Sequence, residues 1–237
     1  MKRFALLIFP ISTVLMSSSD GFAGRRNYVW TYEYQTTGRG ETELETFLTL
    51  SAPDIDSLEN NTFVEHQIEL EIGMNDRFDV GIYQLFEQAP GQSLTYSGFK
   101  LEGRYRIGEK GRHIVDPLLY LEYKGKPDFS EHEVEFKLIL ARDFGPGNIS
   151  LNPIVEFVNG DESEVEAGYA AGIGRKFGRL MKFGIEAKGS ESGNYIGPVF
   201  SHGTEHAWAT LGAAFGVGDI KEGKPEFQIR LLMGFEL

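Results

Sequence analysis

Apolar and polar residues alternate along most of this 237-residue chain. The pattern is clearest at 99–107, 134–140 and 181–188, where every second residue except Gly103 is aromatic or aliphatic and the residues between are mainly Lys, Arg and Glu. Successive side chains of a β-strand point to opposite faces, so a two-residue repeat predicts strands with one apolar and one polar face. No segment keeps the spacing of an amphipathic helix for three turns. The sequence therefore predicts an all-β chain.

The alternating runs are long, and turn residues separate them at regular intervals. They cover 27–36, 41–52, 62–74, 77–87, 94–107, 117–125, 132–143, 148–159, 163–175, 179–188, 194–202, 205–217 and 225–237. Strands of soluble β-sandwiches, which would show the same two-faced pattern, are typically about five or six residues long. A tilted strand that crosses a bilayer needs about 9–11 residues. Run length therefore favours a transmembrane barrel over a soluble sandwich.

The strand count follows from the geometry of such barrels. An up-and-down barrel with both ends on one side of the membrane has an even number of strands, and thirteen runs leave one over. We predict an all-β, transmembrane, antiparallel up-and-down β-barrel of about 12 strands in residues 41–237. The run at 27–36 then belongs to a separate N-terminal aromatic segment, 24–40. Its aromatic face, Tyr28, Trp30, Tyr32 and Tyr34, would either join an interfacial belt or close one mouth of the barrel from inside.

The chain ends on the alternating run "FQIRLLMGFEL", without the polar tail that commonly follows a soluble domain. One face of this run carries Phe227, Ile229, Leu231, Met233, Phe235 and Leu237. We predict that it is the closing strand, paired with the strand that begins at Glu41, because closure leaves no unpaired sheet edge.

The first residues have the layout of a secretory signal peptide. Lys2 and Arg3 precede an apolar run at 4–16, and small residues at Gly21 and Ala23 supply a cleavage site. A run of this length, interrupted by Pro10, is shorter than the ~20 residues of a spanning helix. We therefore predict that residues 1–23 are a signal peptide cleaved near Ala23.

Several stretches carry a family resemblance. The final run resembles the C-terminal strand of Gram-negative outer-membrane barrels, although those usually end in Phe and this chain ends in Leu237. The stretches "ELEIGMNDRFDVGIY" at 69–83 and "IGPVFSHGTEHAWATLGAAFG" at 196–216 are similar to strand–turn–strand units of a broad family of transporter-like outer-membrane barrels, including those labelled as components of phenol degradation. The resemblance implies a barrel in the outer membrane of a Gram-negative bacterium, surrounded by outer-membrane lipid and inserted by the barrel-assembly machinery. It implies no catalytic residue and no cofactor.

A periplasmic C-terminus, as in those barrels, assigns the two ends. Short turns such as 75–76 and 203–204 then lie in the periplasm, and longer links such as 52–61 and 218–224 lie outside, as is usual for outer-membrane barrels. The nine-residue link at 108–116 is the exception on the periplasmic side.

On this register fifteen carboxylates and eight bases face the lumen. The acids are Glu43, Glu45, Glu65, Glu69, Glu71, Glu102, Glu122, Glu133, Glu135, Glu156, Glu164, Glu166, Glu186, Glu226 and Glu236, and the bases are Lys100, Arg104, Arg106, Lys124, Lys137, Lys182, Lys188 and Arg230. A charge removed from water needs a partner or hydration. The lumen is therefore either a lattice of ion pairs or a water-filled pore.

Local pairing should use up most of the bases. We predict that Lys137 pairs with Glu135, and that Lys182 and Lys188 pair with Glu186. The surplus carboxylates would attract cations, and Glu69, Glu71, Glu102 and Glu122 are predicted to form part of an acidic wall.

Other site chemistries are poorly supported by the sequence. The acidic chain, with 35 Asp and Glu against 23 Lys and Arg, gives no reason to bind nucleic acid, and it contains no cysteine. His202 and His206 are separated by a predicted hairpin turn rather than a helical turn, so no metal site is predicted. The glycine pairs at 172–174 and 216–218 open no helix and are not phosphate loops.

An outer-membrane lipid hydrolase would need a nucleophile beside a histidine. His66 faces outward near the external end of its strand, but its expected cross-strand neighbour is Leu48 and no serine lies beside it. We therefore predict no enzyme, and instead a narrow passive channel or transporter for an unidentified small solute, with a preference for cations. A non-conducting structural barrel is the first alternative, and a lipid-active enzyme is the second.

Overall fold

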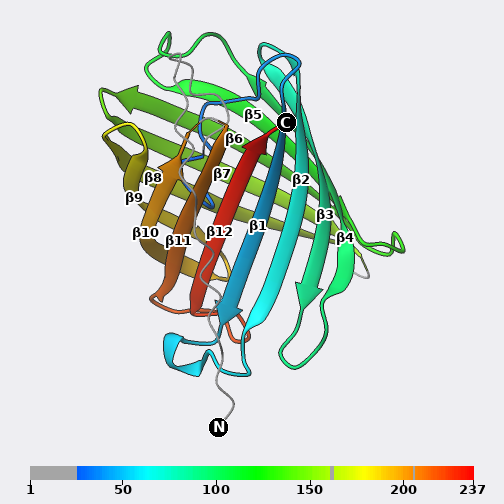
Figure 1. Ribbon diagram of the computed structural model, residues 1–237. Coiled ribbons are helices and arrows are strands. Elements are labelled where there is room, and N and C mark those ends of the chain that lie inside the picture. The colour runs from blue at the N-terminus through cyan, green and yellow to red at the C-terminus, as the bar shows by residue number, and fades with distance from the viewer. Residues whose placement is uncertain (1–25, 161–162, 205) are drawn as a thin grey trace.

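The computed structural model describes residues 26–160, 163–204 and 206–237, and it shows one closed antiparallel barrel (Figure 1). The strands are β1 Thr42–Ala52, β2 Phe63–Asn75, β3 Phe78–Gln88, β4 Thr95–Arg106, β5 Asp116–Gly125, β6 His132–Phe144, β7 Gly147–Asn159, β8 Ser163–Phe177, β9 Met181–Ser190, β10 Gly193–Gly203, β11 Ala207–Val217 and β12 Phe227–Glu236. The predicted signal peptide, 1–23, lies outside the described residues.

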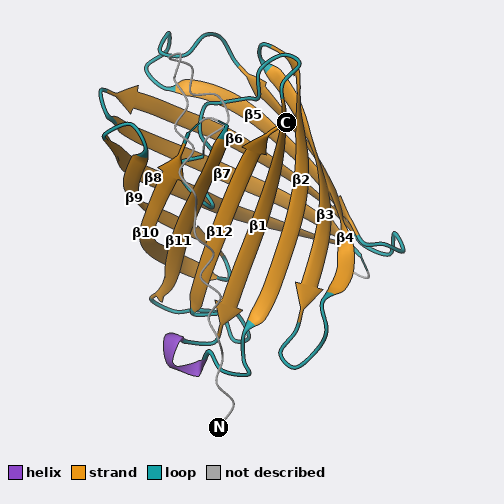
Figure 2. Cartoon of the chain, in the orientation of Figure 1, coloured by secondary structure: helices purple, strands orange, loops and turns teal. Residues whose placement is uncertain are grey.

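Each strand pairs with the next along the chain, and the last strand pairs with the first. Between β1 and β12 the register places Leu48 opposite Leu231, and the N–H of Leu237 donates to the carbonyl of Thr42 over 2.9 Å. The predicted twelve-stranded barrel, closed by the C-terminal run, is therefore confirmed. A short 3-10 turn, Ile55–Ser57, interrupts the all-β architecture (Figure 2). Within the described ranges, no helix has the length and apolar character to cross a membrane.

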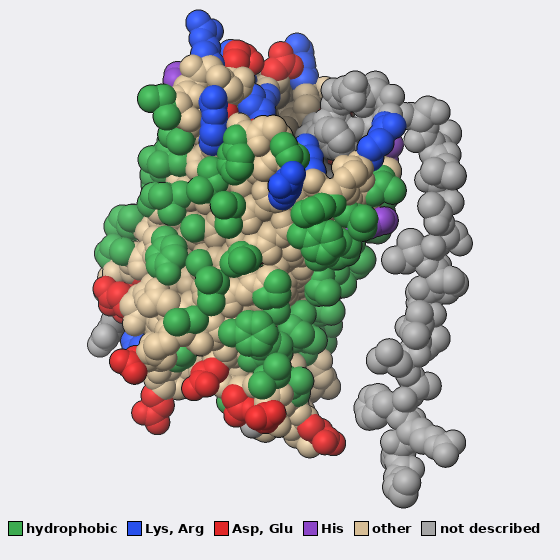
Figure 3. All heavy atoms as spheres, turned by 90° about the vertical axis from the view of Figure 1, so that its left-hand side faces the viewer, with side chains coloured by type: hydrophobic (Ala, Val, Ile, Leu, Met, Phe, Trp, Pro, Cys, Tyr) green, Lys and Arg blue, Asp and Glu red, His purple; other side chains and the backbone are tan. Residues whose placement is uncertain are grey.

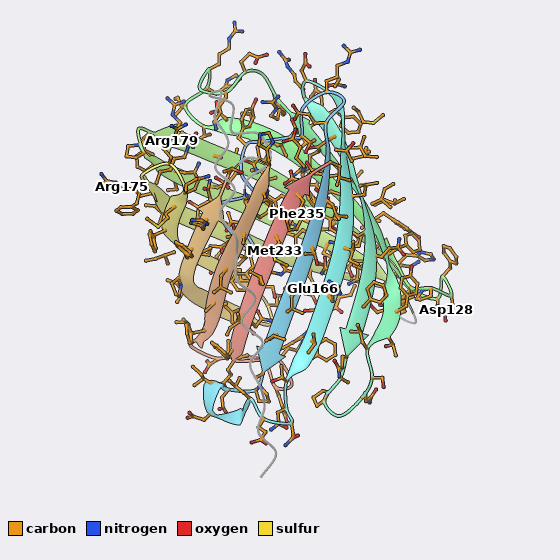
Figure 4. All side chains as sticks on the ribbon, in the orientation of Figure 1. Asp128, Glu166, Arg175, Arg179, Met233 and Phe235 are labelled. Atoms are coloured by element: carbon orange, nitrogen blue, oxygen red, sulfur yellow. The ribbon has the colours of Figure 1, made fainter. Side chains whose placement is uncertain are left out.

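The two ends of the barrel differ in their connections. We call the end where β12 finishes, at the top of Figure 1, the C-terminal end, and the opposite end the loop end. Tight turns join β2 to β3 and β6 to β7 at the C-terminal end, whereas β1–β2 and β11–β12 are joined by longer loops at the loop end. Arg175 and Arg179, beside the β8–β9 turn, accordingly lie away from Asp128 in the β5–β6 loop (Figure 4).

The outer surface of the barrel is apolar around its middle. Side chains such as Leu121, Phe157 and Ile185 remain 50–56% exposed, and Figure 3 shows apolar side chains across the centre of one face with charged side chains at both ends. A continuous apolar surface in water is unfavourable by about 25 cal/mol per Å², so a band of this extent marks a surface covered by lipid or protein. An apolar band between polar ends is the arrangement that a bilayer matches.

The interior holds the second set of alternating residues and two buried clusters. One contains Phe47, Tyr83 and Leu232, and the other contains Leu118, Tyr120 and Ile139. Residues that precede β1 take part in both clusters. The core of this molecule is therefore built around an element that is not part of the sheet.

Leu138 tests which face of the barrel meets lipid. It lies in the middle of β6, opposite Leu119, and between the inward residues Lys137 and Ile139, which are buried. We expect Leu138→Arg to lower the free energy of unfolding from lipid vesicles by about 2–4 kcal/mol, because it places a charge in hydrocarbon. Leu138→Phe is the control. A lipid-facing site accepts the larger ring with little change, whereas a packed interior site would lose stability with either variant.

Candidate functional site in the barrel lumen

The N-terminal segment, residues 26–41, enters the barrel, and its residues 26–37 lie inside. None of its residues is in a strand, and Tyr28, Val29 and Thr31 are at most 1% exposed. It leaves the lumen at the C-terminal end, where the N–H of Gly40 donates to the carbonyl of Gly73 on β2 over 2.9 Å. Of the two positions open for the aromatic run, the structure therefore shows the lumenal one.

Glu186 on β9 binds three consecutive N–H groups of this segment. Its Oε2 accepts from the backbone N–H of Val29 at 2.9 Å, and its Oε1 accepts from those of Trp30 and Thr31 at 2.9 and 2.8 Å. Bonds from N–H groups to an ionised carboxylate are stronger than neutral ones, and this carboxylate is 3% exposed. Glu186 is therefore the main attachment point of the segment to the barrel wall.

This role differs from the predicted pairing of Glu186 with Lys188. Lys188 instead lies over the aromatic rings of Trp30 and Tyr195, at 4.6 and 5.3 Å from their centroids. The prediction was wrong for Lys188 because the alternation gives no sign that another part of the chain enters the lumen and competes for the carboxylate. The pairing of Lys137 with Glu135 is confirmed, at 2.6 Å.

Uncharged polar residues complete the attachment. Asn152 Oδ1 accepts from the N–H of Tyr32 at 2.6 Å, and Ser150 Oγ donates to the carbonyl of Tyr32 at 2.6 Å. The hydroxyls of Ser201 and Thr210 both donate to the carbonyl of Arg26. Buried backbone groups outside a sheet require such partners. Sequence reasoning missed these residues, although each is a small polar side chain at an inward position of its strand.

The twelve lumenal residues predicted from the sequence divide into two sets. Glu69, Glu71, Glu102, Arg104, Glu122, Lys137, Lys182 and Glu186 are buried, and Lys100, Glu135, Glu156 and Arg230 are partly exposed. The first set is densely bonded. Arg104, for example, donates to Asp79 at 2.6 Å and lies 3.3 Å from Glu102. Met233 and Phe235 belong to the predicted apolar face of the closing strand (Figure 4). Phe235 is 45% exposed.

A cavity of about 360 Å³ lies on the loop side of the N-terminal segment. Trp30 and Tyr32 line it from the segment. Its charged lining consists of Arg26, Lys100, Lys137, Lys188, Arg230, Glu122, Glu135, Glu156 and Glu166. The predicted acidic wall is wrong in this respect, because of its four members only Glu122 lines the cavity. The other three, Glu69, Glu71 and Glu102, are buried and do not line it.

A second cavity, of about 50 Å³, lies at the C-terminal end beside the β6–β7 turn. Tyr28 and Tyr34 line it from the segment, and no residue lines both cavities. Within the described chain, the N-terminal segment thus lies between the two cavities. The arrangement is a barrel with a constriction inside it.

The sequence itself finds no match: neither a protein-family model nor a curated protein is similar to it. Solved structures do match. The COG4313 outer membrane channel from Pseudomonas putida F1 superimposes with a TM-score of 0.61 at 10% identity, covering 86% of this chain and 98% of that one. The outer membrane phospholipase A from Escherichia coli gives 0.44 at 14% identity, covering 89% and 95%. Salmonella typhi OmpF, in a complex with daunomycin, gives 0.33 at 8% identity, covering 83% and 97%.

The first of these matches defines the class of fold. The chain is an all-β, twelve-stranded, closed up-and-down barrel that shares the fold of an outer-membrane channel. This is the fold that its sequence resemblance to transporter-like outer-membrane barrels implies. At 10% identity the match concerns the fold alone, so the function has to be argued from the lumen.

An engineered disulfide tests the position of the N-terminal segment. The β-carbon that Gly212 lacks would overlap Cγ2 of Val29, so Val29→Cys with Gly212→Cys brings two sulfurs within bonding reach. The chain has no cysteine of its own. We expect oxidation to cross-link this pair nearly completely, which peptide mapping of the oxidised protein would show.

The matched control is Val29→Cys with Leu211→Cys. Leu211 is adjacent to Gly212 but is 48% exposed on the outer surface, so its sulfur cannot reach residue 29. Equal cross-linking in the two variants would contradict a segment docked inside the lumen.

Proposed function

We propose that the protein is a narrow passive channel for small solutes in the outer membrane of a Gram-negative bacterium. The observation that carries the proposal is a charged cavity inside a closed, externally apolar barrel, constricted by a segment that belongs to no strand. A barrel with a purely structural role does not require a charged cavity of about 360 Å³ in its lumen. Outer-membrane lipid and the barrel-assembly machinery are the proposed partners of its outer surface and closing strand.

The constriction can move without breaking the barrel. Side chains of the wall, chiefly Glu186 and Asn152, hold residues 29–32, whereas the strands are held by their own ladders. A conformation with the segment displaced would cost these side-chain bonds and leave the sheet intact. The channel is therefore an equilibrium between an occluded and a more open lumen, and its position depends on these bonds.

The proposed preference for cations rests on the distribution of charge. The cavity lining carries five bases and four acids, so it contributes little selectivity. Acids predominate at the loop end, where Asp56 and Glu59 are exposed before β2 and where Figure 3 shows acidic side chains gathered at the bottom of the barrel. Fixed negative charge at a pore entrance raises the local concentration of cations.

A lipid-active enzyme is the second candidate. On the outer surface, His66 Nε2 lies 2.9 Å from the hydroxyl of Thr46, a neighbour that sequence reasoning overlooked. Phe86 packs against the same imidazole, and in the described chain no carboxylate or amide is bonded to it. A histidine without an orienting partner is a weak general base for this chemistry. Release of fatty acid from phospholipid, lost in His66→Ala, would establish this function in place of the channel.

Conductance across a planar bilayer tests the channel. We expect small currents from the wild-type protein and larger or more frequent openings from Glu186→Ala, because that variant removes the acceptor of three backbone N–H groups. Glu191→Ala is the control, since it removes the same charge from an exposed position at the following turn. Absence of current from both wild type and Glu186→Ala would support the non-conducting structural barrel instead.

Ion selectivity is measured in the same apparatus. Across a potassium chloride gradient, we expect a reversal potential displaced toward the equilibrium potential of potassium. The displacement should shrink as salt concentration rises, because salt screens the exposed acids. A reversal potential displaced toward that of chloride would refute the cation preference but not the channel.

A further inference from the structure

Four carboxylates form a buried block on the first two strands. Glu43 and Glu45 on β1 face inward beside Glu71 and Glu69 on β2, and each is at most 4% exposed. The strand register places Glu45 directly opposite Glu69, and Glu43 directly opposite Glu71. Like charges at directly opposed positions destabilise a sheet, and burial increases the cost. Two such pairs side by side require a compensating charge.

The bonded bases do not supply enough of it. Arg104 contacts Glu71, but it is also bonded to Asp79 and Glu102. Arg26 approaches Glu45 only to 3.8 Å. Six carboxylates, counting Asp79 and Glu102, therefore share two guanidinium groups in the described chain. Hydrogen bonds relieve some of this charge, as when Trp208 Nε1 donates to Glu43, but they do not neutralise it.

Two oxygens of the block have no hydrogen-bond partner among the described residues. They are Oε2 of Glu45 and Oε1 of Glu69, both buried, and Glu69 is 1% exposed. The space beside Glu69 depends on a glycine, because a β-carbon at Gly81 on β3 would collide with Oε1. The wall is thus shaped to hold a carboxylate oxygen that no protein donor reaches.

We propose that Glu45, Glu69 and Glu71 bind a divalent cation of the calcium or magnesium class. One carboxylate oxygen from each residue lies within 4.8 Å of the others, a spacing that one ion bonded at about 2.0–2.6 Å to each oxygen satisfies. An all-oxygen set selects hard cations over the softer metals that thiolate or imidazole would favour. The ion supplies the positive charge that the block lacks.

The site also connects the barrel wall to the N-terminal segment. The hydroxyl of Thr37 is bonded to Glu71, and the N–H of Thr37 donates to Asp79 at 2.7 Å. A cation at the block therefore holds the part of the segment that leads into β1. The block does not line the open cavity, so the proposed ion is a bound ion of the wall and not a permeating one.

Metal binding is tested on the full-length mature protein refolded into detergent. Samples refolded with EDTA, calcium or magnesium are compared for bound metal after desalting and for the temperature at which the heat-modifiable band unfolds. We expect about one tightly held ion per barrel, with a higher unfolding temperature in its presence. Terbium, which replaces calcium, should show luminescence sensitised by Tyr83, opposite Glu69, and Trp208, bonded to Glu43.

The variant Glu45→Gln with Glu69→Gln keeps the shape of the block and removes two charges. We expect it to lose the bound ion and the terbium signal and to unfold at the same temperature with EDTA or calcium. Glu156→Gln with Glu166→Gln is the control, because it alters another opposed pair of inward glutamates that lines the open cavity. Wild-type protein that binds no stoichiometric metal would overturn the proposal and indicate carboxylates that share protons. So would equal metal binding by the two double variants. Neither result bears on the conductance experiments.

Discussion

Closure of the sheet is the constraint on which the rest of this structure depends. A strand in hydrocarbon has no water to satisfy its backbone N–H and carbonyl groups, so each must be bonded to a neighbouring strand. Twelve strands meet this condition only because β12 pairs with β1 along ten residue pairs, from Ala52 opposite Phe227 to Glu43 opposite Glu236. Once the sheet is closed, the two-residue repeat leaves each side chain one of two positions, the lipid-facing surface or the lumen.

The lumen must then accommodate the entire polar half of the alternation. A barrel of this size is wide enough to enclose side chains and some water, and the protein fills it unevenly. Toward the C-terminal end the space is taken by the N-terminal segment and a dense set of ion pairs around Arg104. Toward the loop end it remains a cavity of about 360 Å³. The inward charges therefore form a bonded interior in one half of the barrel and line an open cavity in the other.

Features of the barrel that follow from the local residue pattern could be predicted from the sequence. Features that require contacts between distant residues could not. Strand positions, strand number and the closing pair follow from the alternation and from the parity of the strands, and the structure confirms them. The ion pair of Lys137 with Glu135 is also a local feature, since the two residues lie close together on one strand. The role of Glu186 is not, because its partners Val29, Trp30 and Thr31 are more than 150 residues away in the chain. Nor does a single-strand pattern show that Glu45 will face Glu69, which requires the register between β1 and β2.

We propose that the N-terminal segment occludes the lumen and that permeation requires it to move. The most direct measurement is the current through one barrel carrying Val29→Cys and Gly212→Cys, recorded first oxidised and then after a reductant is added to the same bilayer. We expect almost no current while the disulfide holds residue 29 against β11, and openings like those of the wild type once it is reduced. An unchanged current in the two states would show that solutes pass without displacing the segment, which would contradict occlusion by residues 26–37.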